Sequence, residues 1–152
     1  MARRLARYQH RLKVPCIEQF FGCLLFADIS GFTPLTERLS ALGSEGIEKL
    51  SRALNSFFGT LVSTITEYGG DVVKFAGDAV FAQWPCTAEP DLLFVALLVT
   101  QCALTLQRRL NKFQVEDGGV LTLKIGIACG QLTNIVVGSD HGTEVCLFLL
   151  CI

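Results

Sequence analysis

Hydrophobic positions along the chain follow two periods that alternate in sequence. The run FFGCLLFAD, residues 20–28, is continuously apolar and ends on an aspartate, which is typical of a strand buried on both faces. Residues 44–68 instead carry apolar side chains every three or four positions, and the following glycine pair predicts the end of that helix. A shorter helix before it is predicted to begin with Thr33 as its cap and Pro34 in its first turn.

The second half of the chain repeats the alternation. DVVKFAGDAVFAQW, residues 71–84, predicts a hairpin around a tight Ala-Gly-Asp turn. Residues 89–112 predict a helix, and VLTLKIGIACG, residues 120–130, predicts a strand with alternating apolar positions. The order β-α(α)-β-β-α-β predicts an α+β fold of the ferredoxin-like (split βαβ) type, with one antiparallel sheet and helices packed on one face.

Composition limits the classes of function. The chain has 152 residues and is 51% hydrophobic against 18% charged, which is typical of one folded domain. Five of its thirteen Lys and Arg residues lie within residues 1–13, so the other eight face fourteen acids and the remainder carries a net charge of −6. A basic surface for nucleic acid is therefore not expected.

Cysteine usage and hydropathy indicate a compartment. None of the seven cysteines forms a C-x-x-C pair, which favours buried thiols in a reducing, cytoplasmic environment over a disulfide framework or a zinc site. The Arg-rich start is interpreted as an amphipathic lead-in helix, with a mitochondrial presequence as the alternative. The most apolar helix, residues 92–106, is too short for a membrane span, so we expect a buried core helix and no transmembrane segment.

The predicted topology brings two aspartates together. Right-handed crossovers place the third strand between the first and second, so the end of the first strand meets the beginning of the third. Asp28 lies at the first of these places and Asp78 at the second. Two carboxylates that close repel unless a cation lies between them, and a sparse oxygen site suits Mg²⁺. The alternative is that Asp28 only caps a helix and Asp78 is an ordinary turn residue.

Next to Asp28, the segment ISGFTP ends the strand and opens a helix. Backbone N–H groups at such a helix start bind anions, and Gly31 allows the chain to approach a ligand closely. A dicarboxylate metal site beside an amide cradle fits chemistry at a nucleotide phosphate.

Two segments, LLFADISGFTPLTERL and EYGGDVVKFAGDAVFAQW, resemble the metal-binding strand and hairpin of the class III nucleotide cyclases. The similarity is greatest to the first catalytic domain of the soluble, bicarbonate-responsive adenylyl cyclases of animals. It covers residues 17–140, a partial cyclase domain, and leaves a basic lead-in (1–16) and a divergent apolar tail (141–152). The resemblance implies an adenylate cyclase of intracellular signalling, which converts ATP to cyclic AMP and pyrophosphate.

The resemblance also implies roles for individual residues. Asp28, Asp78 and the Ile29 carbonyl would hold two Mg²⁺ ions, for which Mn²⁺ or Ca²⁺ would substitute. ATP would be bound by both aspartates, by Lys124 and by the amides of a short segment, namely Ile29, Ser30, Gly31, Phe32 and Thr33.

Two lysines have alternative interpretations. Lys124 resembles a strand lysine that reaches the phosphates, but is otherwise a solvent-facing cation. Lys74 resembles a lysine that selects the base or, at the degenerate twin site of the soluble enzymes, contacts bicarbonate; its alternative is an exposed hairpin cation.

From about residue 142 the sequence no longer matches the family pattern. Family members supply a transition-state asparagine and arginine from a later helix of a partner domain, so we expect no catalytic residue of that kind here and activity only with a second cyclase domain. The alternatives are an inactive nucleotide- and metal-binding dimerisation or regulatory fragment, and another two-metal nucleotidyl transferase, which the acidic remainder disfavours. The tail VCLFLLCI predicts either an edge strand or an exposed apolar patch.

Overall fold

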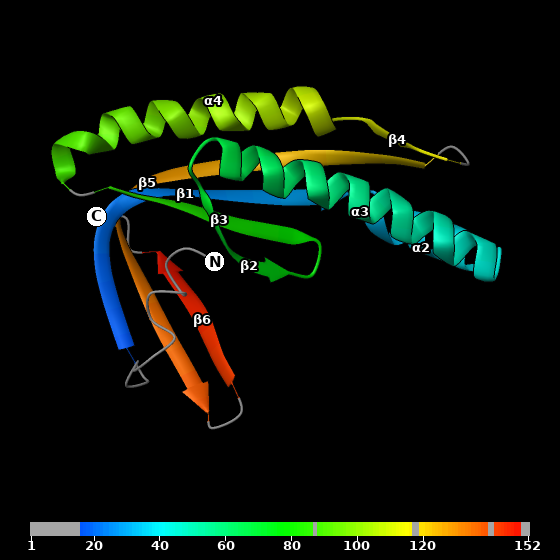
Figure 1. Cartoon of the computed structure of the whole chain (residues 1–152), viewed down its shortest axis with the longest axis horizontal. Helices are drawn as coiled ribbons and strands as arrows, with labels where there is room; N and C mark the ends of the chain where they lie inside the picture. The colour runs from blue at the N-terminus through cyan, green and yellow to red at the C-terminus, as the bar shows by residue number, and fades with distance from the viewer. Residues whose placement is uncertain (1–15, 87, 117–118, 140–141, 150–152) are drawn as a thin grey trace.

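The computed structural model describes residues 16–86, 88–116, 119–139 and 142–149 (Figure 1). The lead-in expected at residues 1–16 lies outside these ranges except for Cys16, which begins the first strand. In chain order the elements are β1 (Cys16–Ser30), α2 (Phe32–Ser40), α3 (Ser44–Glu67), β2 (Asp71–Ala76), β3 (Ala79–Cys86), the 3-10 turn η1 (Glu89–Asp91), α4 (Leu92–Leu110), β4 (Phe113–Val115), β5 (Gly119–Ser139) and β6 (Gly142–Leu149).

The strands form one antiparallel sheet in the order β2-β3-β1-β5-β4, and β6 pairs with β5 off this path. From Phe21 to Asp28, strand β1 is hydrogen-bonded along both edges, to β3 and to β5, which explains its continuous apolar run. The third strand of the predicted order, β3, lies between the first and the second. The predicted split βαβ sheet is therefore confirmed.

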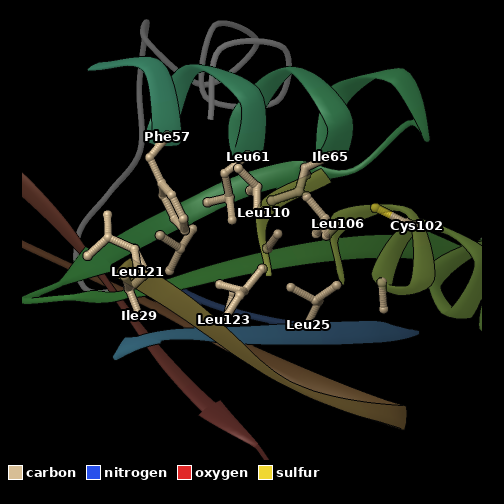
Figure 2. Packing of buried hydrophobic residues seen from close by; sticks show 14 of the residues in the cluster. Leu25, Ile29, Phe57, Leu61, Ile65, Cys102, Leu106, Leu110, Leu121 and Leu123 are labelled. Atoms are coloured by element: carbon tan, nitrogen blue, oxygen red, sulfur yellow. The ribbon is translucent and has the colours of Figure 1, made fainter. Parts of the chain in front are cut away.

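Alternate residues of β1 face the helices and form the core of the domain. Cys23, Leu25, Ala27 and Ile29 are all buried there, against side chains of α3, α4 and β5. Figure 2 shows Leu25 and Ile29 in this packing. The helix side chains that meet them are Phe57, Leu61 and Ile65 of α3 and Leu106 and Leu110 of α4. Because strand side chains alternate, the residues between them, Asp28 included, point to the opposite face of the sheet.

Polar contacts fix α4 on the sheet and against α3. The Gln107 side-chain amide donates to the Leu123 carbonyl of β5 at 2.7 Å. Arg109 donates to the Thr64 hydroxyl at 2.8 Å and to the Glu67 carboxylate at 3.0 Å, both on α3. These contacts hold the C-terminal half of α4 in one register over β5.

Helix α4 is less buried than the sequence predicts. Five of its side chains are buried, but Leu93, Phe94, Leu97 and Leu104 are 73%, 70%, 63% and 50% exposed. The stretch Glu89–Leu110 is also long and apolar enough to cross a membrane, with 22% of its apolar window buried. The expected core helix thus buries one side and presents a second apolar side outward.

The boundaries of several elements differ from the prediction. Helix α2 begins at Phe32 after Gly31, so Thr33 lies in the first turn and is not the cap. Strand β5 continues to Ser139 because its later half pairs with β6 and the beginning of β1, a long-range pairing that local periodicity does not report. Strand β4 was not predicted. For the described part of the tail, which ends at Leu149, the first alternative is confirmed, because β6 forms an added strand beside β5.

The expectation that the cysteines are free thiols is wrong for one pair. Cys23 of β1 and Cys129 of β5 are direct partners in the sheet register and form a disulfide, with Cα atoms 4.1 Å apart. They are separated by 106 residues in sequence, so their spacing gave no signal. Cys102 remains a free thiol inside the core, where burial raises its pKa to about 11 and keeps it protonated.

We expect Leu61→Ala to destabilise the domain by about 2–5 kcal/mol, because it leaves a cavity among fully buried side chains. The matched control is Leu42→Ala at a 55% exposed position, which should change the free energy of unfolding by less than about 0.5 kcal/mol. Urea unfolding followed by circular dichroism measures both. Equal shifts for the two variants would contradict the assignment of the core.

Candidate active site

The two aspartates predicted to converge lie on neighbouring strands at one end of the sheet. Asp28 is paired with Ala79, the first residue of β3, and Asp78 directly precedes it in the hairpin turn. The Ile29 amide donates to the Asp78 carbonyl at 3.2 Å, so the two backbones are in direct contact. Asp28 is half-buried and Asp78 is exposed. Sheet pairing has thus brought together residues fifty positions apart in sequence.

Lys124 lies on the other side of Asp28. It is the direct partner of Asp28 in the β1–β5 register, and it is exposed. Directly paired residues share a face of the sheet, with Cα atoms about 4.5–5.5 Å apart. A cation therefore lies beside the Asp28 carboxylate on the face opposite the helices. This placement fits a lysine that reaches the phosphates of a bound nucleotide.

After β1 the chain turns at Gly31 and begins α2. The first backbone amides of a helix have no hydrogen-bond partner within it. Gly31 has a φ of 96°, and a Cβ atom at this position would lie 2.5 Å from the Val120 carbonyl oxygen, so only glycine fits. No side chain caps α2 and its first turn contains no acid. The first-turn amides of Phe32 and Thr33 can therefore donate to an anion, whereas Pro34 has no N–H to offer.

Lys74 occupies the same face of the sheet as Asp28 and Lys124, which we call the site face. It lies in the row of paired residues that contains Phe26, two residues before Asp28 along β1. It is paired with Phe81, which is paired in turn with Phe26 of β1. With a strand spacing of about 4.8 Å and a rise of about 3.3 Å per residue, its Cα lies about 12 Å from that of Asp28. Lys74 is exposed, so its side chain is accessible from the site face.

Sequence reasoning missed the aromatic pair between Lys74 and Asp28. The rings of Phe26 and Phe81 lie 5.0 Å apart at 52°, and Phe26 is 37% exposed. Phe26 precedes Asp28 by two residues, so the period of a strand could have placed it on this face. An exposed aromatic surface here gives a flat ligand something to stack on.

The donor atoms at this end of the sheet suit a hard divalent cation. Two carboxylates and backbone carbonyls are oxygen ligands, and Mg²⁺ commonly takes one or two carboxylates, several waters and substrate phosphates. Within the described ranges, no group of three or more His, Cys, Asp or Glu side chains could hold a metal. A site at Asp28 and Asp78 would therefore leave most coordination positions to water or to a bound phosphate.

The site face carries no arginine of its own among the described residues. All arginines in those ranges belong to helices, namely Arg38, Arg52, Arg108 and Arg109. Arg109 is also engaged by Glu67 and Thr64. Within the described ranges, the positive charge on this face therefore comes from lysines such as Lys124 and Lys74.

Comparison with known proteins identifies the domain. A family model described as the adenylate and guanylate cyclase catalytic domain matches residues 21–148, which include most of the segment that the sequence set apart as a tail. The chain is 36% identical over 128 residues to adenylate cyclase type 10 of Rattus norvegicus and 34% identical to that of Homo sapiens. The matches cover 83% of this chain but only 8% of each relative.

Solved structures share the fold. The adenylyl cyclase CyaB from P. aeruginosa superposes with a TM-score of 0.68 at 21% identity, covering 88% of this chain and 67% of that one. The guanylate cyclase domain of RhGC from Catenaria anguillulae, in complex with GTP, superposes with a TM-score of 0.66 at 21% identity, covering 86% and 68%. With the family match across most of its length, the chain belongs to the adenylate and guanylate cyclase catalytic domains.

Proposed function

We propose that this chain is one half of an adenylate cyclase, which forms cyclic AMP and pyrophosphate from ATP once a second cyclase domain completes its site. The observation that carries the proposal is the meeting of Asp28, Asp78 and Lys124 at one sheet end, beside the uncapped start of α2. Each of these groups alone is common on protein surfaces. Together they provide cation ligands, a positive charge and amide donors where a triphosphate would bind.

Each part of the site has a distinct role in this reaction. Asp28, Asp78 and the Ile29 carbonyl would hold two divalent ions, Mg²⁺ by preference. Bound there, the ions would lower the pKa of the ribose 3′-hydroxyl and stabilise the charge of the leaving pyrophosphate. The amides of Phe32 and Thr33 would donate to the phosphates, and Lys124 would neutralise part of their charge.

Base recognition would fall to the neighbouring row of residues on the site face, which contains Lys74, Phe81 and Phe26. With the phosphates at Asp28, Lys74 would contact the far end of the nucleotide, and the Phe26 ring would offer a surface for stacking. The names of the relatives favour adenine over guanine. A bicarbonate anion at Lys74 is the alternative that the resemblance implies.

Metal-dependent binding tests the metal ligands. We expect the chain to bind ATP in the presence of Mg²⁺ or Ca²⁺, and Asp28→Ala to abolish the metal-dependent part of the affinity because a carboxylate ligand is lost. Glu37→Ala is the matched control, since it removes an exposed carboxylate of α2. Isothermal titration calorimetry with and without the cation measures the effect. Equal affinities for the wild type and Asp28→Ala would refute the assignment.

Activity tests the need for a partner. We expect the purified chain with Mn²⁺ and ATP to be slower than a completed pair by about 10⁴-fold or more, because two transition-state contacts of roughly 2.7–4 kcal/mol each are missing. Adding a cyclase domain that carries the asparagine and arginine should restore cyclic AMP synthesis. Asp78→Ala should then remove it. Robust turnover by the chain alone would contradict the proposed half-site.

A further inference from the structure

The outer side of α4 is an apolar surface on a helix that is otherwise well anchored. We define the α4 face as the exposed residues along this side, namely Leu93, Phe94, Leu97, Thr100, Gln101 and Leu104. Four of these are large hydrophobic side chains that expose half to three-quarters of their area. Exposed apolar surface gathered on one helix side, rather than scattered singly, is typical of a contact surface.

The spacing of the α4 face is that of a helix–helix seam. Leu93, Leu97, Thr100 and Leu104 follow one another at steps of four, three and four residues, the a/d pattern of a heptad. The inner side of the same helix packs on the sheet through Val99 and other buried residues. Helix α4 therefore has two apolar sides. One packs on the sheet, and the other, the α4 face, is exposed.

The charges at the two ends of the α4 face make it self-complementary. Glu89 and Asp91 lie at its N-terminal end, Arg108 lies at its C-terminal end, and residues 92–107 between them carry no charge. An antiparallel pair of such helices places the acidic end of each against the basic end of the other. A parallel pair would set like charges together.

We infer that the α4 face binds the α4 face of a second copy of this chain, antiparallel and around a two-fold axis. Centred between Leu98 and Val99, this pairing sets Leu93 against Leu104 of the second copy and Leu97 against Thr100. The contact is isologous, so each copy contributes the same residues and the assembly closes as a dimer. About three turns of helix, residues 93–104, then bury their apolar side.

A membrane is the other surface that an apolar helix side can meet, and the residues disfavour it. Amphipathic helices that lie on membranes carry Lys and Arg along the polar side, whereas α4 has acids at one end and arginines only at the other. One of these, Arg109, is engaged by α3. Lifting α4 into a bilayer would also separate its buried side from the core.

The inferred dimer is independent of the proposed cyclase activity. Asp28 and Lys124 lie on the sheet face opposite the helices, so pairing through α4 leaves the nucleotide face free for a second cyclase domain. Two half-sites can therefore be held in one assembly without either being covered.

Sedimentation equilibrium of the full chain tests the inference, over protein concentrations from about 1 μM to about 500 μM. We expect the wild type to dimerise and Leu97→Glu to remain monomeric throughout, because the variant places two like charges at the centre of the contact. The matched control is Ile47→Glu, at an exposed position of α3, which should dimerise like the wild type. Circular dichroism confirms that both variants are folded.

Charge reversal distinguishes the antiparallel arrangement from other dimers. Glu89→Arg and Arg108→Glu should each raise the dissociation constant by about tenfold, since each dimer contains two such pairs, and the double variant should restore it. A wild type that stays monomeric, or a dimer unaffected by Leu97→Glu, would overturn the inference. So would a monomer that co-floats with phosphatidylcholine–phosphatidylserine vesicles, which would assign the α4 face to a membrane.

Discussion

Pairing along both edges of β1 is the constraint on which the rest of the structure depends. Between Phe21 and Asp28 this strand has neighbours on both sides, so its backbone hydrogen bonds are satisfied within the sheet and the stretch can be buried and apolar. Its register with β3 and β5 then fixes which residues of these two strands lie beside each residue of β1. A shift of one residue would send Asp28 into the core and Leu25 to the site face. The burial of alternate β1 side chains therefore fixes the site as well as the fold.

The two faces of the sheet have separate tasks for the same reason. Alternation along β1 assigns one face to the helices and the other to Asp28, with Lys124 beside it and Lys74 one row away. The core can thus be packed tightly without compromising a polar site that binds charged ligands. It also explains why an apolar contact through α4 and a nucleotide on the sheet face do not compete for the same surface.

Much of the site was accessible to sequence reasoning, because it depends on short-range signals joined by one topological rule. Asp28 follows an apolar run, Asp78 lies in a hairpin turn, and handedness alone puts those places together. The predicted start of α2 was wrong because Thr33 suits both the cap position, which was predicted, and the first turn, where it lies. Pro34 is favourable in the first turn in both cases. The close approach of the Val120 carbonyl, which demands glycine at position 31, comes from a distant strand and leaves no local trace.

The sequence by itself determined the alternation of strands and helices, the order of the sheet and the identity of the charged groups at its end, since these follow from periodicity, chain breakers and handedness. Only the tertiary structure decided the contacts that depend on register between distant segments. It joined Cys23 to Cys129, extended β5 to Ser139 and left Leu93 and Leu97 of an apolar helix exposed. The physical reason is that hydrophobic periodicity shows which positions of an element are apolar. Which neighbour covers that surface is set by packing elsewhere in the chain.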